Sequence, residues 1–196
     1  MPLGRHRSGA ENALSWLLIA NLWEMPQYTY ETIVSGLAGT PDVLADLASE
    51  IARLGDDVPE DQAEITERAF EFSERMISDT ASGFPTNALE GLGRWAMATQ
   101  LNDERWLAFT ERVVDATDGY IDFGVEVGDR CREAQPSAAG LRILTRMLGR
   151  GEVWEQHHIE GVAVEALRRA SRAGLHDVAV DQLRERLIQR GRYDVD

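Results

Sequence analysis

A helical repeat of apolar residues runs through nearly the whole chain and restricts the folds open to it more than any other feature. In residues 40–55, Thr40 is a suitable N-cap, Pro41 occupies the first helical position and Gly55 is a stop signal. The apolar stripe of this segment consists of Val43, Leu44, Leu47, Ile51 and Leu54. This pattern predicts an amphipathic helix with one buried face.

The remaining segments repeat this pattern. Residues 56–79 have Asp57 near the cap, Pro59 in the first turn and an apolar face of Ile65, Ala69, Phe72 and Met76. After the break at 82–85, two helices are expected at 86–101 and 102–119, joined at Asn102–Asp103. Three more are expected at 137–151, 152–174 and 176–191, the last two ending at Gly174 and Gly191.

Residues 120–134 are ambiguous because Gly124 and Gly128 weaken a helix, while apolar residues from Tyr120 to Val127 partly alternate as in a strand. We favour a helix. The predicted fold is therefore all-α, with about nine or ten helices in antiparallel hairpins that form a bundle or a short α-solenoid.

The expected organisation is one continuous domain with four parts. They are an N-terminal arm (1–10), an acidic helical subdomain (11–81), a repeat-like region of helical hairpins (86–192) and a tail (193–196).

One hairpin, at about 163–191, resembles the tetratricopeptide and HEAT-type helical-repeat families. Gly174, and Ala179 and Leu183 four residues apart, match the turn glycine and packing residues of a tetratricopeptide repeat. The signature Trp, Leu-Gly, Tyr and Pro of that family are replaced by Ala163, Ala166–Leu167, Ala170 and Gly191. The resemblance implies a binding scaffold.

Residues 11–25 differ from the other helices because apolar side chains cover nearly the whole circumference, leaving few polar positions. Such a helix must be buried on all sides, either in the core or against another subunit. Trp16 and Trp23 make an interface with another subunit credible, since tryptophan is enriched in interface hot spots.

Composition excludes several functions. The net charge of −14 argues against a general nucleic-acid binder. All 20 basic residues are arginine, which excludes a Schiff-base lysine and a P-loop lysine. A single cysteine, the absence of a long apolar run and the absence of a signal peptide predict a soluble, cytoplasmic protein that does not contact a membrane.

The stretch "EVWEQHHIE" (152–160) raises the possibility of a metal site or an acid/base pair. His157 and His158 diverge on a helix, whereas Glu155 and His158 have the three-residue spacing of a ligand pair. The helix that this stretch opens should bury an apolar face that consists of Ile159, Val162, Ala163, Ala166, Leu167 and Ala170. We therefore expect a solvated helix face with His158 partly packed. The alternative is a metal-binding bundle or an enzyme that uses Glu155, His157, His158 and Glu160.

Other candidate motifs are incomplete. "DATDGYIDFGVE" (115–126) resembles part of an EF-hand loop, but Val114, Ala116 and Val125 occupy ligand positions, so we predict a turn between helices. "EGLGRW" (90–95) is a weak glycine motif. Arg130 and Arg132 flank Cys131 and are of the sign that lowers a thiol pKa, but no histidine pairs with it by a known signature. We predict no catalytic residues and no cofactor.

Charge is unevenly distributed along the chain. Residues 11–64 contain 11 acids and one arginine, whereas residues 136–196 contain ten arginines and nine acids. Arg142, Arg146 and Arg150 fall four apart in a segment, 136–151, that has no acid. They are candidates either for a salt-bridged surface or for contact with an acidic partner.

The sequence therefore predicts a non-catalytic protein–protein interaction or assembly module. Its candidate contact residues are Trp16, Trp23, Arg142, Arg146 and Arg150. Expected partners are another protein or a second copy of the chain, with acidic residues 40–64 as one possible target of the arginines. Contact between a polyanion or nucleic acid and the three arginines is a second alternative, and nucleic acid is disfavoured by the net charge.

Overall fold

A computed structural model describes residues 31–32, 47–53, 63–79, 86–99 and 101–193. Within these residues the protein has eight helices and no strand, so the predicted all-α class is confirmed and the expected count of nine or ten is slightly too high. Residues 47–53 are helical. The other elements are α4 (Ala63–Ser78), η3 (Thr86–Met97), α5 (Asp103–Ala116), α6 (Gly124–Glu133), α7 (Ala138–Met147), α8 (Val153–Arg172) and α9 (Val178–Gln189).

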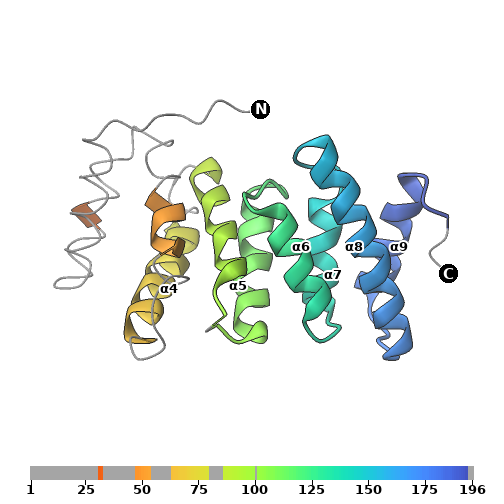
Figure 1. Ribbon diagram of the computed structural model, residues 1–196, viewed down its shortest axis with the longest axis horizontal. Helices are drawn as coiled ribbons and strands as arrows, with labels where there is room; N and C mark the ends of the chain where they lie inside the picture. The colour runs from red at the N-terminus through yellow and green to blue at the C-terminus, as the bar shows by residue number, and fades with distance from the viewer. Residues whose placement is uncertain (1–30, 33–46, 54–62, 80–85, 100, 194–196) are drawn as a thin grey trace.

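The helices lie side by side in chain order along the longest axis, from α4 at one end to α9 at the other (Figure 1). Three hairpins follow one another: η3 with α5, α6 with α7, and α8 with α9. Each helix also packs on the helix two positions along the chain, which gives one layer of η3, α6 and α8 and a second of α5, α7 and α9. Stacked hairpins of this kind bury a continuous core between neighbours.

The segment 86–97 forms a 3-10 helix instead of the expected α-helix. Runs of 3-10 helix this long are uncommon, and they bring side chains three residues apart onto one line. Leu89, Leu92, Trp95 and the following Ala98 have this spacing, and all are buried. The apolar residues therefore match a period of three, which keeps them all against the core.

Gly93 of the "EGLGRW" motif lies where two backbone segments meet. A Cβ atom at this position would lie 1.9 Å from the carbonyl oxygen of Asp122. The backbone N–H of Asp122 donates to the carbonyl of Glu90, 3.0 Å away, so the loop before α6 lies directly on η3. The glycine allows this close approach of two backbones.

The ambiguous segment 120–134 is divided between a loop and a helix. Residues 120–123 are not helical, and α6 begins at Gly124, so the helix that we favoured is confirmed for its main part. Gly128 weakened that prediction, yet a Cβ atom there would meet Cδ1 of Ile159 at 2.6 Å. Its absence lets α6 pack closely on α8.

Several predicted helix boundaries and faces are confirmed. Asn102 caps α5 by accepting from the backbone N–H of Arg105 at 2.9 Å. Gly174 and Gly191 follow α8 and α9 with φ of 69° and 83°, as expected for glycines that end helices. The predicted buried face of α8 is found as expected and consists of Ile159, Val162, Ala163, Ala166, Leu167 and Ala170.

The predicted faces at the N-terminal end are confirmed where the structure describes them. Leu47 and Ile51 are buried, as are Ala69, Phe72 and Met76 of α4. The remaining predicted positions lie outside the described residues, and they are Thr40, Pro41, Val43, Leu44, Leu54, Asp57, Pro59 and the side chain of Ile65.

Aromatic residues join α4, η3 and α5. Phe70 contacts Trp95 edge-to-face at 5.1 Å between ring centroids and contacts Phe109 at 4.6 Å. The indole N–H of Trp95 donates to the hydroxyl of Ser73 at 3.0 Å, which itself donates to the carbonyl of Ala69. The polar atom of this buried ring is therefore satisfied within the core.

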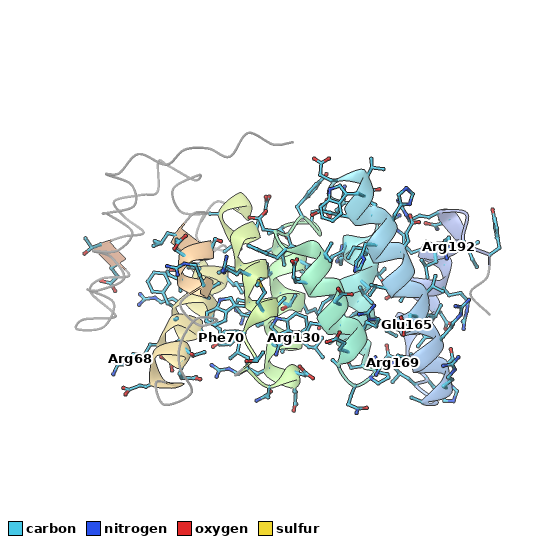
Figure 2. The ribbon with its side chains drawn as sticks, viewed as in Figure 1. Arg68, Phe70, Arg130, Glu165, Arg169 and Arg192 are labelled. Atoms are coloured by element: carbon cyan, nitrogen blue, oxygen red, sulfur yellow. The ribbon has the colours of Figure 1, made fainter. Side chains whose placement is uncertain are left out.

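Arg130 of α6 connects the first hairpin to the second (Figure 2). Its guanidinium donates to four backbone carbonyls at the end of η3 and just beyond it, at distances from 2.6 to 3.3 Å. These carbonyls belong to Trp95, Ala96, Ala98 and Leu101. A cation at a helix C-terminus satisfies carbonyls that have no partner within the helix.

The same guanidinium lies over the ring of Trp106 at 4.6 Å and pairs with Asp103 at 3.4 Å. Its side chain is only 13% exposed. Burial lowers the pKa of Arg130 from its ordinary value, while the charge of Asp103 opposes that shift. The cost of burying the charge is thus offset by hydrogen bonds, a carboxylate and an aromatic face.

None of the helices in the described residues is both long and apolar enough to cross a membrane.

We expect Arg130→Met to lower the free energy of unfolding by about 3 kcal/mol, because buried carbonyls at the end of η3 lose their donors. Urea denaturation followed by circular dichroism measures this change. Arg132→Met removes the same charge at the next arginine along α6, which pairs with Asp129 and Glu133 at the surface, and should cost less than about 1 kcal/mol. Equal losses in the two variants would contradict the role assigned to Arg130.

Candidate interaction groove

A surface groove of about 470 Å³ lies across the layer formed by α5, α7 and α9. We call it the charged groove, and its lining residues are Glu111, Asp115, Asp118, Arg142, Thr145, Arg146, Arg150, Gln182 and Arg186. It contains all three arginines that the sequence singled out. Four arginines and three carboxylates line it, so that charged side chains dominate its surface.

Each of the three arginines on or just after α7 pairs with an acid on or just after α5. Arg142 donates two hydrogen bonds to the carboxylate of Glu111, one of them 3.2 Å long. Arg146 pairs with Asp115 at 3.0 Å, and Arg150 pairs with Asp118. The hydrogen bonds with Glu111 raise the pKa of Arg142.

The three pairs differ in exposure. Glu111 is 23% exposed and accepts a two-pronged contact, which fixes Arg142 in one geometry. Arg146 and Asp115 are 56% and 52% exposed, so solvent screens their attraction. Arg150 also lies over the ring of Tyr120, 5.1 Å from its centroid. Arg150 and Asp118 are 34% and 70% exposed, so Arg146 is the most exposed of the three arginines.

Arg186 of α9 completes the groove on the opposite side. Its guanidinium donates to the carbonyl of Leu148 at 3.3 Å, and among the described residues no carboxylate forms an ion pair with it. The neighbouring lining residue on α9, Gln182, is uncharged. The three carboxylates therefore balance the three arginines of the row, and Arg186 adds one positive charge to the lining. Asp177, the N-cap of α9, also acts on Arg142 by its charge.

The absence of acids from residues 136–151 is misleading, because the compensating carboxylates come from another helix. Glu111 precedes Arg142 by 31 residues, and Asp118 precedes Arg150 by 32. The two offsets are nearly equal because both pairs join α5, or the turn after it, to α7, or the turn after it. This near-equal spacing was the available signal, although Arg186 and Gln182 have no comparable one.

Most of the other C-terminal arginines make contacts within the protein. Arg190 donates to Glu160 at 2.7 Å and to Gln156, Arg184 pairs with Asp181, and Arg169 donates to the carbonyl of Ala134. These contacts agree with a salt-bridged surface for that part of the chain.

The residues of "EVWEQHHIE" point to separate partners. Glu155 accepts the backbone N–H of Glu152 at 2.9 Å, as in a capping box at the start of α8. His157 is exposed, and His158 is half-buried with Nε2 3.0 Å from Asp129. No cluster of three or more His, Cys, Asp or Glu side chains that could hold a metal is found in the described part of the chain.

The EF-hand-like segment forms a turn between α5 and α6, as predicted. Asp118 and Phe123 have φ of 52° and 58°, a left-handed conformation that is unusual for residues other than glycine. The carboxylate of Asp118 is used by Arg150. This turn therefore serves to hold α5, α6 and α7 together.

The environment of Cys131 contradicts the effect expected from its arginine neighbours. The thiol is buried, and burial raises its pKa far above the ordinary value, although the charge of Arg130 acts in the opposite direction. Desolvation of the thiolate outweighs the nearby charge. Cys131 thus lacks the environment of a reactive cysteine.

Trp16, Trp23 and the apolar segment 11–25 lie outside the described residues. No protein-family model, no curated protein and no solved structure matches this chain. The geometry and charges described above are therefore the basis for its function.

We expect Cys131 to react with a thiol reagent such as Ellman's reagent only after unfolding, because both burial and a raised pKa suppress the thiolate. Absorbance at neutral pH, in buffer and in denaturant, measures this. Rapid labelling of the folded protein would contradict the buried position.

Glu90 generates a second prediction. Burial raises its pKa, and the negative charge of Asp122 adds to that shift. The folded state therefore favours the protonated form. Its stabilising contribution is present below the pKa of the unfolded chain, about 4.3, and is lost as pH rises through the folded-state pKa.

We accordingly expect Glu90→Gln to raise the free energy of unfolding at pH 7 and to have little effect at about pH 4. Thermal or urea unfolding across this range tests the sign. Glu165→Gln, at an exposed position of α8, is the matched control and should change stability little. Destabilisation at neutral pH by Glu90→Gln alone would show that the carboxylate has a favourable partner.

Proposed function

We propose that this protein is a non-catalytic protein–protein interaction or assembly module built on stacked helical hairpins. The observation that carries the proposal is the charged groove, which three successive hairpins form across one layer. Stacks of hairpins present extended surfaces of this kind to partners. The half-exposed Arg146–Asp115 pair gives the groove charged groups that are accessible from solvent.

Self-association is part of this proposal. The sequence of residues 11–25, with Trp16 and Trp23, predicts an apolar helix, and the acidic N-terminal part of the sequence complements the arginine-rich C-terminal third. Either feature suits a contact between copies of the chain, one through apolar burial and the other through charge.

Absolute mass from light scattering after size exclusion, at low and high salt, tests the assembly part of the proposal. A dimer that is independent of salt, and that Trp16→Ala with Trp23→Ala disrupts, would support association through residues 11–25. A larger species that dissociates in salt would support contact between the acidic and arginine-rich regions. A monomer under both conditions would exclude self-association and leave only a different protein as partner.

Metal analysis of protein purified without a histidine tag tests the non-catalytic part. We expect no stoichiometric metal, because Glu155 accepts from the backbone and His158 pairs with Asp129. Stoichiometric iron, manganese or zinc that is lost in His158→Ala would overturn the proposal in favour of a metal-binding bundle.

A further inference from the structure

We propose that the charged groove binds an extended acidic segment of a partner protein, with carboxylates at alternate positions along that segment. This inference rests on the proposed function, since it names the partner of the same surface. The segment lies along α7, between the arginine row of Arg142, Arg146 and Arg150 and the facing Arg186.

The lining of the charged groove carries one positive charge that its own carboxylates do not balance, which favours an anionic ligand. The three carboxylates come from α5 or the turn after it and pair with the arginine row, while α9 contributes Gln182 and Arg186 to the lining. Arg186 donates to a carbonyl, and a guanidinium carries five N–H donors. An incoming carboxylate therefore finds donors on both sides of the groove.

Replacing one partner of the exposed ion pair costs little free energy. Arg146 and Asp115 are each more than half exposed, and such pairs contribute little to stability. A carboxylate from a partner can share Arg146 with Asp115 or replace Asp115. Glu111 holds Arg142 more firmly, so Arg146 and Arg186 carry most of the contact.

The spacing of the arginines selects the form of the ligand. Arg142 and Arg146 lie four residues apart on α7, or about 6 Å along the helix axis, and Arg150 follows beyond the end of that helix. Side chains on the same side of an extended segment recur every two residues, or about 6.6 Å. Acidic residues at alternate positions therefore match the step from Arg142 to Arg146.

The charges around the row favour such a peptide over a nucleic acid. Glu111, Asp115 and Asp118 lie within the groove, and the whole chain carries a net charge of −14. Closely spaced phosphates would be repelled by both. A short segment with a few carboxylates meets the arginines and encounters less of this repulsion.

Fluorescence anisotropy with two labelled peptides tests the inference on the full-length protein. One peptide alternates serine and glutamate, and the other contains the same residues with the glutamates in one block. We expect the alternating peptide to bind at least about threefold more tightly at an ionic strength of about 0.15 M. Equal affinity for the two peptides, or no binding by either, would overturn the proposed recognition.

Three variants locate the site. Arg146→Gln with Arg186→Gln should weaken binding of the alternating peptide at least about tenfold, through loss of two charge-assisted contacts. Asp115→Asn should tighten binding a few-fold by removing the competing carboxylate. Arg184→Gln, on the same helix as Arg186 but outside the groove lining, is the matched control and should leave binding within about twofold.

Other results would assign the groove differently. Tighter binding of a single-stranded oligonucleotide, lost with Arg146→Gln and Arg186→Gln and falling steeply with salt, would replace the peptide by a nucleic acid. Loss of binding in Arg184→Gln as large as in the groove variant would indicate a nonspecific charge effect and overturn the site. If neither peptide binds but the protein still self-associates, this inference alone is contradicted. A bound catalytic metal would instead contradict the proposed function.

Discussion

The first two hairpins depend most on the hydrogen bonds and the ring contact of the Arg130 guanidinium. A 3-10 helix of this length ends with carbonyls that need donors, and the side chain that supplies them comes from α6. Arg130 also covers the ring of Trp106, which belongs to α5. One residue therefore fixes the positions of three helices, because its planar fork matches several carbonyls at once.

Close backbone contact reinforces the same junction. The loop before α6 lies on η3 at Gly93, and α6 lies on α8 at Gly128. These close contacts lie where α6 packs on η3 on one side and on α8 on the other. The face of α5, α7 and α9 then follows, because each of these helices is the second member of a hairpin.

The sequence was sufficient to predict the all-α class, the buried face of α8 and helix ends such as Asn102 and Gly191, because these depend on local periodicity and capping. It was insufficient for properties that depend on distant residues. Cys131 has two arginine neighbours, but burial decides its pKa. The arginines of α7 have no acidic neighbours in the chain, but α5 provides them. Glycines that weaken a helix locally are the ones that permit its packing.

Solvent exposure separates the arginines of this protein that stabilise the fold from those that keep donors available to solvent. Arg130 is largely buried, and its donors are used by carbonyls and Asp103, so no further ligand can be accommodated without breaking the fold. Arg146 pairs with Asp115 and is more than half exposed, and Arg186 donates to the carbonyl of Leu148. An exposed guanidinium with few partners loses little when a ligand replaces one of them. A chain without lysine thus places the same side chain in buried and in exposed positions, and burial decides which arginines keep donors available to solvent.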